Sequence, residues 1–218
     1  MNKALSFVRL DFITVKPYWK QLLVILGAPV FMTINTGGST SGIVIAMMMG
    51  IMIFNFPFAI GSKNNIDALY IVLALNRNTV VLGRYLFTLA INIYLGAAAN
   101  IITFIIRTVM QKGFDVWTHF IFTAIMILAC SIVQAVQLPI FFKFGYEKAR
   151  LAAYLPLFVI IPVAILIQNF ISQETMDRLF EWYAANQAIT AVIAVVLWLS
   201  VVTISYLVSA SCYKKRDF

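Results

Sequence analysis

Six long apolar runs constrain this chain more than any other feature of its sequence. A helix needs about 20 residues to cross a hydrocarbon core of roughly 30 Å. The runs that approach or exceed this length are about 18–34, 42–60, 80–106, 117–142, 152–171 and 188–210. Charged residues make up only 11% of the 218 residues, too few to cover a water-soluble domain. We therefore expect an all-α integral membrane protein, a single domain with six transmembrane helices.

The positive charges predict which side of the membrane is cytoplasmic. Six spans place 13 of the 16 Lys and Arg residues on one side and only Arg107, Lys112 and Arg178 on the other. An excess of Lys and Arg in short connections marks the cytoplasmic side, so both termini are expected in the cytoplasm. An odd number of spans would break this separation. Because the cations lie between apolar runs and form no basic patch, we expect no nucleic-acid partner.

Two segments outside the spans are expected to be amphipathic helices on the membrane surface. Residues 1–17 mix apolar and cationic side chains before a proline, which predicts a helix held at the inner surface partly by anionic lipid. A disordered basic tail is the alternative. Residues 172–187 place Trp182 and Tyr183 among acidic side chains, which predicts a short helix at the outer interface.

The sequence carries no motif for catalysis. The phosphate-binding pattern GxxxxGK[ST], the zinc-protease pattern HExxH and any Cys/His cluster are absent. The middles of the six runs hold no charged residue, although pumps and ion-driven carriers keep such residues there at a cost of about 2.5–3.5 kcal/mol. We therefore expect no enzyme activity, metal or cofactor in this chain, and we expect the energy for any uphill transport to come from a partner.

Several residues in the second and fifth runs suit a substrate pathway. Flexible thioethers adapt to varied apolar partners, and prolines bend membrane helices into kinks that can be static or mobile. Ordinary helix packing is the alternative for the methionines. The pathway candidates are Met48, Met52, Asn55, Phe56, Pro156 and Pro162.

Uncharged amides inside the third and fourth runs also admit two interpretations. Asn92 and Asn100 recur at helical spacing, and Gln134 and Gln137 lie in the fourth run. They could form the polar wall of a pathway or hydrogen bonds between helices, and we prefer the second interpretation.

The connections on the cytoplasmic side carry the most specific patterns. Within residues 61–79, a short helix could begin at Asn64 or Asn65, since asparagine is a good N-cap. That helix would expose Leu69 and Tyr70, with Leu73 one turn on, at the spacing that suits a hydrophobic groove on a partner.

Residues 75–86 read LNRNTVVLGRYL and resemble the L-P-x-x-R-x-x-x-V-x-x-R/K-Y-L signature of ABC-2 type permeases, without its proline. The resemblance is to the small six-span bacterial kind. Residues 139–150 read PIFFKFGYEKAR and are similar to the family pattern P-x-x-F-K-F-G-x-E-K-A-R. The tail 213–218 also resembles the family's ending. Among relatives, the permeases of phenol-soluble modulin exporters are the most similar.

This resemblance implies an ABC-2 (type V exporter-like) permease fold in the bacterial cell membrane. Such permeases pair with a second permease chain, identical or different, and each docks on a subunit of an ABC ATPase dimer that binds ATP and Mg. The loop after the second span, residues 61–79 here, is the coupling helix of the family. The substrate route would follow the dimer interface along the first, second and fifth spans, with residues 172–187 as an outer gate. The residues expected to couple to the ATPase are Asn64, Asn65, Asp67, Leu69, Tyr70, Leu73, Arg77, Arg84, Lys143, Glu147, Lys148 and Arg150.

The function expected from residues and resemblance together is export of amphipathic or antimicrobial peptides, or of other lipophilic compounds, driven by a separate ATPase. A non-transporting immunity or sensor subunit is one alternative, and it predicts no ATPase partner. An ion-coupled carrier is another, and it predicts transport that depends on the membrane gradient and not on ATP.

Overall fold

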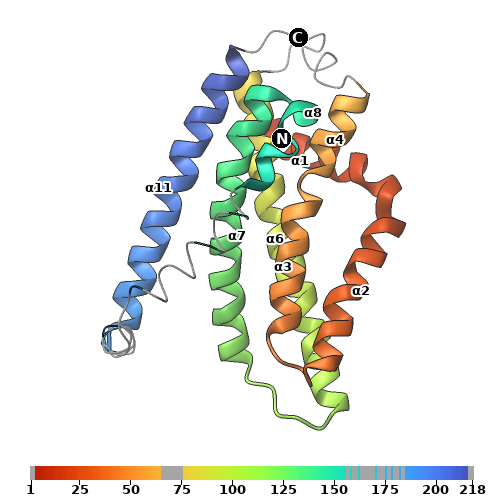
Figure 1. Cartoon of the computed structure of the whole chain (residues 1–218), viewed down its shortest axis with the longest axis vertical. Coiled ribbons are helices and arrows are strands. Elements are labelled where there is room, and N and C mark those ends of the chain that lie inside the picture. The colour runs from red at the N-terminus through yellow and green to blue at the C-terminus, as the bar shows by residue number, and fades with distance from the viewer. Residues whose placement is uncertain are drawn as a thin grey trace.

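The computed structural model describes residues 3–64, 76–155 and 186–215, together with isolated positions between 158 and 185. Every regular element in these residues is a helix, as the sequence predicts (Figure 1). The α-helices are α1 (Lys3–Val15), α2 (Trp19–Asn35), α3 (Ser41–Ile53), α4 (Phe56–Lys63), α6 (Arg77–Val109), α7 (Val116–Phe144), α8 (Tyr146–Ala149) and α11 (Gln187–Lys214). Short 3-10 turns lie at Lys16–Tyr18 and Ala152–Tyr154.

Four helical stretches of the described chain are long and apolar enough to cross a membrane. They are Ser41–Lys63, which joins α3 and α4, and the helices α6, α7 and α11. Their bounds coincide within a few residues with the second, third, fourth and sixth expected spans. The first expected span corresponds to α2, which has 17 residues. Most of the expected fifth span and of the expected outer helix 172–187 lies outside the described residues.

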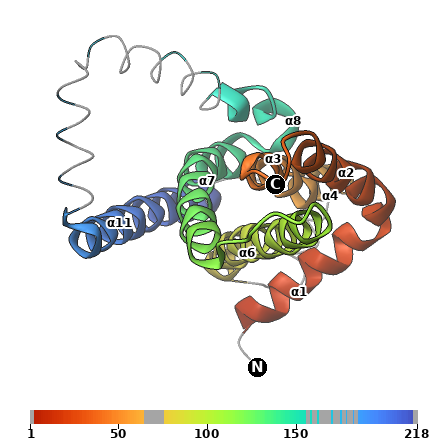
Figure 2. The same cartoon turned by 90° about the horizontal axis from the view of Figure 1, so that it is seen from below.

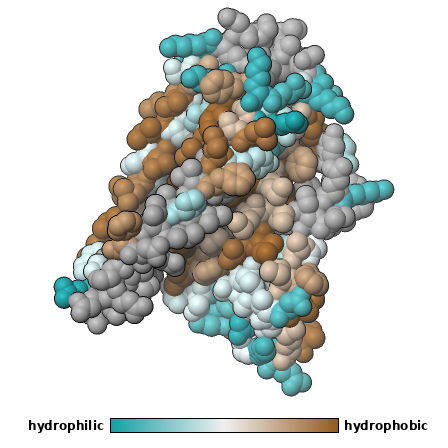
Figure 3. Space-filling view, viewed as in Figure 1, coloured by the Kyte–Doolittle hydropathy of each residue, from teal (hydrophilic) through white to brown (hydrophobic). Residues whose placement is uncertain are grey.

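The distribution of apolar side chains over the surface agrees with the assignment of these helices as membrane-spanning. Apolar side chains cover the middle of the face in Figure 3, and polar side chains gather at its two ends. Many of the large hydrophobic residues of α6 and α11 are exposed, including Ile101 at 60% and Leu197 at 59%. Lipid is the environment that favours such a surface.

Helices α3, α6 and α7 form the centre of the bundle, and α1 lies across α6 (Figure 2). Ile43 and Met47 of α3 are fully buried in this core. Asn92 of α6 exchanges hydrogen bonds with Gln134 of α7 at 2.6 and 3.2 Å and donates to Ser131 at 3.3 Å. Asn100 Nδ2 donates to Thr123 Oγ1 at 2.6 Å. The interpretation of these amides as bonds between helices is therefore confirmed.

The second expected span is divided where α3 ends. Phe54 and Asn55 form a turn, and Pro57 lies in the first turn of α4. A proline is tolerated there because its missing N–H has no intrahelical acceptor at a helix start. Pro57 thus lies at the boundary between α3 and α4.

The turn between α2 and α3 is held by two cations, Arg107 in the last turn of α6 and Lys112 in the α6–α7 connection. Gly37 and Gly38 have positive φ angles of 65° and 83°, which glycine adopts without strain. Lys112 Nζ donates to the carbonyl of Gly37 at 3.1 Å, and Arg107 Nη1 donates to that of Gly38 at 3.1 Å. We call this end of the bundle the turn end and the opposite one, where α8 lies, the α8 end (Figure 1).

Next to this turn, α2 and α3 approach so closely that only glycine fits at position 42. A Cβ atom there would overlap Thr33 Oγ1, which donates to Pro29 O at 2.7 Å, and would lie 3.1 Å from that same carbonyl oxygen. We expect Gly42→Ala to lower the free energy of unfolding by about 1–3 kcal/mol, because the two helices must move apart. Thermal unfolding of the protein in detergent measures this change.

Gly27→Ala is the matched control, since a Cβ at Gly27 meets no atom within 4 Å. It should leave the unfolding temperature unchanged or raise it. Adding Thr33→Ala to Gly42→Ala removes the overlapping hydroxyl and should restore part of the loss. Equal effects of the two glycine substitutions would refute the close approach of α2 and α3.

Candidate functional site

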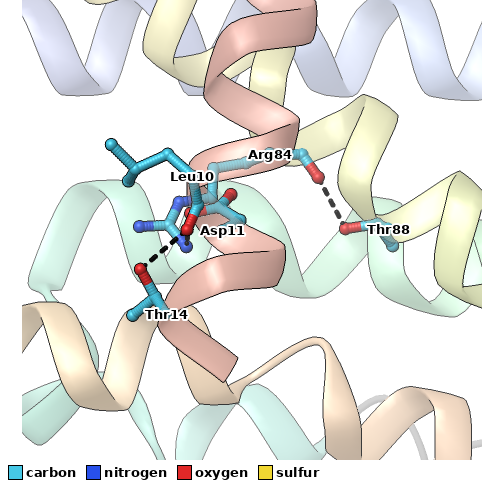
Figure 4. Close-up of polar contacts among 5 residues, drawn as sticks. All are labelled: Leu10, Asp11, Thr14, Arg84 and Thr88. Carbon is cyan, nitrogen blue, oxygen red and sulfur yellow. Dashed lines mark hydrogen bonds and ion pairs between the residues drawn. The ribbon is translucent and has the colours of Figure 1, made fainter. Parts of the chain in front are cut away.

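A buried ion pair joins α1 to α6 at the α8 end of the bundle. Arg84 Nη1 lies 3.0 Å from Asp11 Oδ1, and the two side chains are 5% and 1% exposed (Figure 4). Arg84, expected from the sequence among the residues that contact an ATPase, therefore faces the interior of its own chain. It cannot touch a partner directly in this arrangement.

The face of α1 that meets α6 explains why the pair forms. Phe7, Asp11 and Val15 recur every four residues and are all buried, at 5%, 1% and 4% exposure. Gly83 of α6 admits this face, because a Cβ there would lie 2.7 Å from the ring of Phe7. The sequence predicts α1 correctly as a helix. Its Leu10 and Phe12 are partly exposed, although the ring of Phe12 also contacts that of Phe87 in α6 at 5.0 Å between centroids.

The charges of the pair are taken out of water at a cost. Burial raises the pKa of the Asp11 carboxyl to about 6, and the neighbouring Arg84 guanidinium acts in the opposite direction. The direction of this shift means that burial outweighs the attraction between the two groups. The pair is therefore not expected to stabilise the fold more than two apolar side chains of similar volume would. What it does is fix the position of α1 on α6.

Aromatic rings surround the guanidinium of Arg84. Its Cζ atom lies 4.7 Å from the ring centroid of Phe58 in α4 and 5.8 Å from that of Phe7, within the range of cation–π attraction. The Phe58 ring stacks on Phe141 of α7 at 5.1 Å, and Phe141 stacks on Tyr146 of α8 at 5.8 Å. A continuous line of side-chain contacts therefore runs from α1 through α6, α4 and α7 to α8.

A second branch of this cluster reaches α11. Phe142 contacts Phe58 at 5.4 Å and Tyr213 at 5.2 Å between ring centroids. Arg77, at the start of α6, donates from Nη1 to the carbonyls of Tyr213 at 3.0 Å and Lys214 at 2.6 Å. Arg77 thus caps the C-terminus of α11, where a cation is favoured. We call the residues of these two branches, with Asp11 and Arg84, the junction cluster.

The connection after α7 projects from the junction cluster. Gly145 reverses the chain with φ 74°, a conformation that other residues rarely adopt, and α8 follows at once. Ala149 is buried and Tyr146 is half-buried, so these two anchor α8. The charged side chains of this connection, all exposed, are Lys143, Glu147, Lys148 and Arg150.

The other expected coupling residues divide between described and undescribed positions. Asn64 is exposed and is the C-cap of α4, and the helix expected to begin at this residue would lie outside the described residues. The alternative start, Asn65, lies outside the described residues, as do Asp67, Leu69, Tyr70 and Leu73. The helix before this segment, α4, carries Phe58 and so belongs to the junction cluster.

The expected pathway residues are not brought together as one face. Met48 and Met52 are exposed at 53% and 50%, whereas Asn55 is buried and donates to Tyr154 Oη at 3.3 Å. Asn55 lies in the turn between α3 and α4. Phe56 is half-buried in α4, and Pro162 is an exposed helical position. Pro156 lies outside the described residues.

Sequence reasoning missed Asp11 as a site residue. Its signal was present: Asp11 is the first acidic residue of the chain, the next being Asp67, and it stands four residues from both Phe7 and Val15. An isolated acid on the apolar face of a cationic helix indicates a buried partner of opposite charge.

The fold and this junction define a multi-pass helical membrane protein that gathers its connecting segments at one end. A family model described as ABC-2 family transporter protein matches residues 6–214. The chain belongs to this family, and it is a permease subunit of an ABC transporter. Comparison with curated proteins and with solved structures finds no match for the chain.

The pair can be tested by removing one charge or both. We expect Asp11→Ala to lower the free energy of unfolding by about 3–5 kcal/mol, because it leaves the Arg84 charge buried without a counterion. The double variant Asp11→Leu/Arg84→Met replaces both charges by apolar side chains and should recover most of that loss. Chemical unfolding in detergent, followed by circular dichroism, measures both.

Glu147→Ala is the control, since it removes an exposed carboxylate of α8 and should change the free energy of unfolding by less than about 0.5 kcal/mol. If Asp11→Ala is no more harmful than this control, the ion pair does not exist in the membrane-embedded protein.

Proposed function

We propose that this chain is the permease of an ATP-driven exporter that moves amphipathic or antimicrobial peptides, or other lipophilic compounds, out of a bacterial cell. The observation that carries the proposal is the connection around α8, which exposes the charged side chains of Lys143, Glu147, Lys148 and Arg150, while Tyr146 of α8 joins the aromatic cluster around Arg84. A surface helix so anchored is suited to receive force from a partner.

The α8 end is proposed to be cytoplasmic, with six spans and both termini on that side. The start of α1, the end of α4, the start of α6, all of α8 and the end of α11 lie at this end (Figure 1). Arg107 and Lys112 hold the opposite turn. Thirteen of the 16 cations would then be cytoplasmic, in agreement with the rule that short cytoplasmic connections are rich in Lys and Arg.

Residues 61–79 and α8 are proposed to dock on an ABC ATPase dimer, which would supply ATP and Mg. The two connections leave the bundle from adjacent places, because α4 and α8 contact each other and α4 ends at Asn64. Force on either connection would reach α1 and α6 through Phe58 and Arg84. The junction cluster is thus proposed to move as one block.

A second permease chain is proposed to complete the substrate route. Met48 and Met52 lie exposed on α3, where they would face lipid, the partner permease or the substrate. Adaptable thioethers on such a surface suit lipophilic substrates of varied shape. This supports a lipophilic cargo in preference to a small ion.

Assembly with an ATPase tests the docking surfaces. We expect the chain to co-purify with an ATPase encoded beside it, and the double change Leu69→Asp/Tyr70→Asp to abolish co-purification, because two charges would enter an apolar groove. Lys148→Glu/Arg150→Glu should weaken assembly by at least about tenfold through reversal of charge on α8. Pull-down from detergent at several salt concentrations measures both.

Arg178→Glu is the matched control, since Arg178 is exposed and is placed outside the cell by the proposed topology. It should leave assembly unchanged, and all variants should retain the elution volume of the folded permease. A complex that survives both sets of changes, or that is lost with Arg178→Glu alone, would contradict the proposed docking surfaces.

A further inference from the structure

A cavity lies between α6, α7 and α11, away from the expected substrate route. It is partly open, and its volume is about 270 Å³. Its walls are mostly apolar, with Leu86 and Leu89 from α6, Leu138 from α7, and Val202 from α11. Helix α11 lies beside α7 near its Lys214 end and diverges from it toward Gln187 (Figure 1, Figure 2).

Four of the polar side chains on this wall, those of Tyr85, Thr88, Ser131 and Gln134, are already bonded within the protein. Tyr85 Oη bonds to Ser205 Oγ at 2.5 Å and to Ser209 Oγ at 2.8 Å. Gln134 bonds to Asn92, and the hydroxyls of Thr88 and Ser131 donate to carbonyls of their own helices. These groups therefore need no hydrogen-bond partner from a molecule in the cavity.

Trp198 of α11 differs from these four side chains. Its side chain lines the cavity, and its Nε1 is buried without a hydrogen-bond partner among the described residues. An indole N–H can only donate, and a buried donor left unpaired is destabilising by roughly 1–3 kcal/mol. An occupant with an acceptor oxygen would satisfy it.

The depth of Trp198 restricts what that occupant can be. Trp198 is 11 residues from Gln187 and 16 from Lys214, which at 1.5 Å per residue is about 16 and 24 Å from the two ends of α11. The ester oxygens of a phospholipid lie at the border of the hydrocarbon core, roughly 15 Å from its middle. A phospholipid would therefore fill the cavity with acyl chain and leave the indole unpaired.

The volume restricts the occupant further. An apolar cavity of about 150 Å³ holds one benzene molecule, so by proportion 270 Å³ holds roughly ten to twelve non-hydrogen atoms. We propose that this cavity binds a compact lipophilic molecule with a single carbonyl or ether oxygen, which accepts a hydrogen bond from Trp198 Nε1. Such a molecule would bridge α11 to α6 and α7 where the protein itself provides no polar contact from Trp198.

Propiophenone is a suitable probe because its roughly ten non-hydrogen atoms match this volume, it carries one carbonyl between a phenyl ring and an ethyl group, and aryl ketones form covalent adducts on irradiation. In the purified permease in detergent, we expect saturable labelling of peptides from α6, α7 or α11. Propylbenzene, which has the same ring and carbon chain and no acceptor, should compete about fivefold less well than unlabelled propiophenone, as expected for one net hydrogen bond. Mass spectrometry of the labelled peptides measures both.

Trp198→Phe keeps an aromatic ring and removes the N–H, so the two competitors should become equal. Trp117→Phe, at a tryptophan that is 70% exposed at the start of α7, should preserve the fivefold difference. Val202→Phe fills the cavity and should abolish saturable labelling.

Three results would overturn the proposal. The first is labelling that does not saturate or that survives Val202→Phe. The second is a preference for the carbonyl that persists in Trp198→Phe. The third is a phospholipid that remains bound in native mass spectrometry and is not displaced by propiophenone. All these measurements use the permease alone, so a failure of the proposed ATPase docking would not affect their outcome.

Discussion

The contact between Asp11 and Arg84 is the constraint on which the α8 end of this permease depends. Each charge is buried, so neither can move away from the other without being left uncompensated in a medium of low dielectric constant. The pair therefore fixes α1 on α6 more strictly than apolar packing alone would. Phe58, placed against the guanidinium, carries the same restraint into α4.

The middle of the bundle is held by a different kind of contact. Neutral amides and hydroxyls pair across α6, α7 and α11, as Asn92 does with Gln134 and as Tyr85 does with Ser205. Such pairs satisfy polar groups without placing a charge at the centre of a membrane, where it would cost about 2.5–3.5 kcal/mol or more. Among the described residues, charged contacts lie toward the two ends of the bundle, in the junction cluster and in the turn held by Arg107 and Lys112.

Hydropathy was sufficient to predict the four spanning stretches of the described residues, because lipid requires about 20 apolar residues wherever a chain crosses it. It also allowed the amides of α6 and α7 to be assigned to helix contacts, since an amide in hydrocarbon needs a partner. The location of Arg84 could not be predicted in this way. A count of cations along the chain treats every cation near a connection as facing solvent. Arg84 instead lies two turns inside α6 and pairs with Asp11, which stands 73 positions earlier in the sequence (84 minus 11).

The different exposure of Met48, Met52 and Asn55 could not be predicted from the sequence either. Helical spacing relates Met48, Met52 and Asn55 only if the helix is continuous, and the turn at Phe54 and Asn55 interrupts it. The proline that permits this break is visible in the sequence, but the residue at which the backbone turns is set by packing: Asn55 pairs with Tyr154 from a distant segment.

A distance measurement between α1 and the end of α8 tests most directly whether the junction cluster is one block. Spin labels at Arg9 and Leu151, both exposed, would be placed in a chain with Cys130→Ala and Cys212→Ser and assembled with the ATPase. The account predicts that ATP changes this distance by less than about 2 Å while the complex hydrolyses ATP, the displacement expected within a packed unit. A shift of roughly one helical turn, about 5 Å, would show that α1 moves independently of α8 and would contradict it.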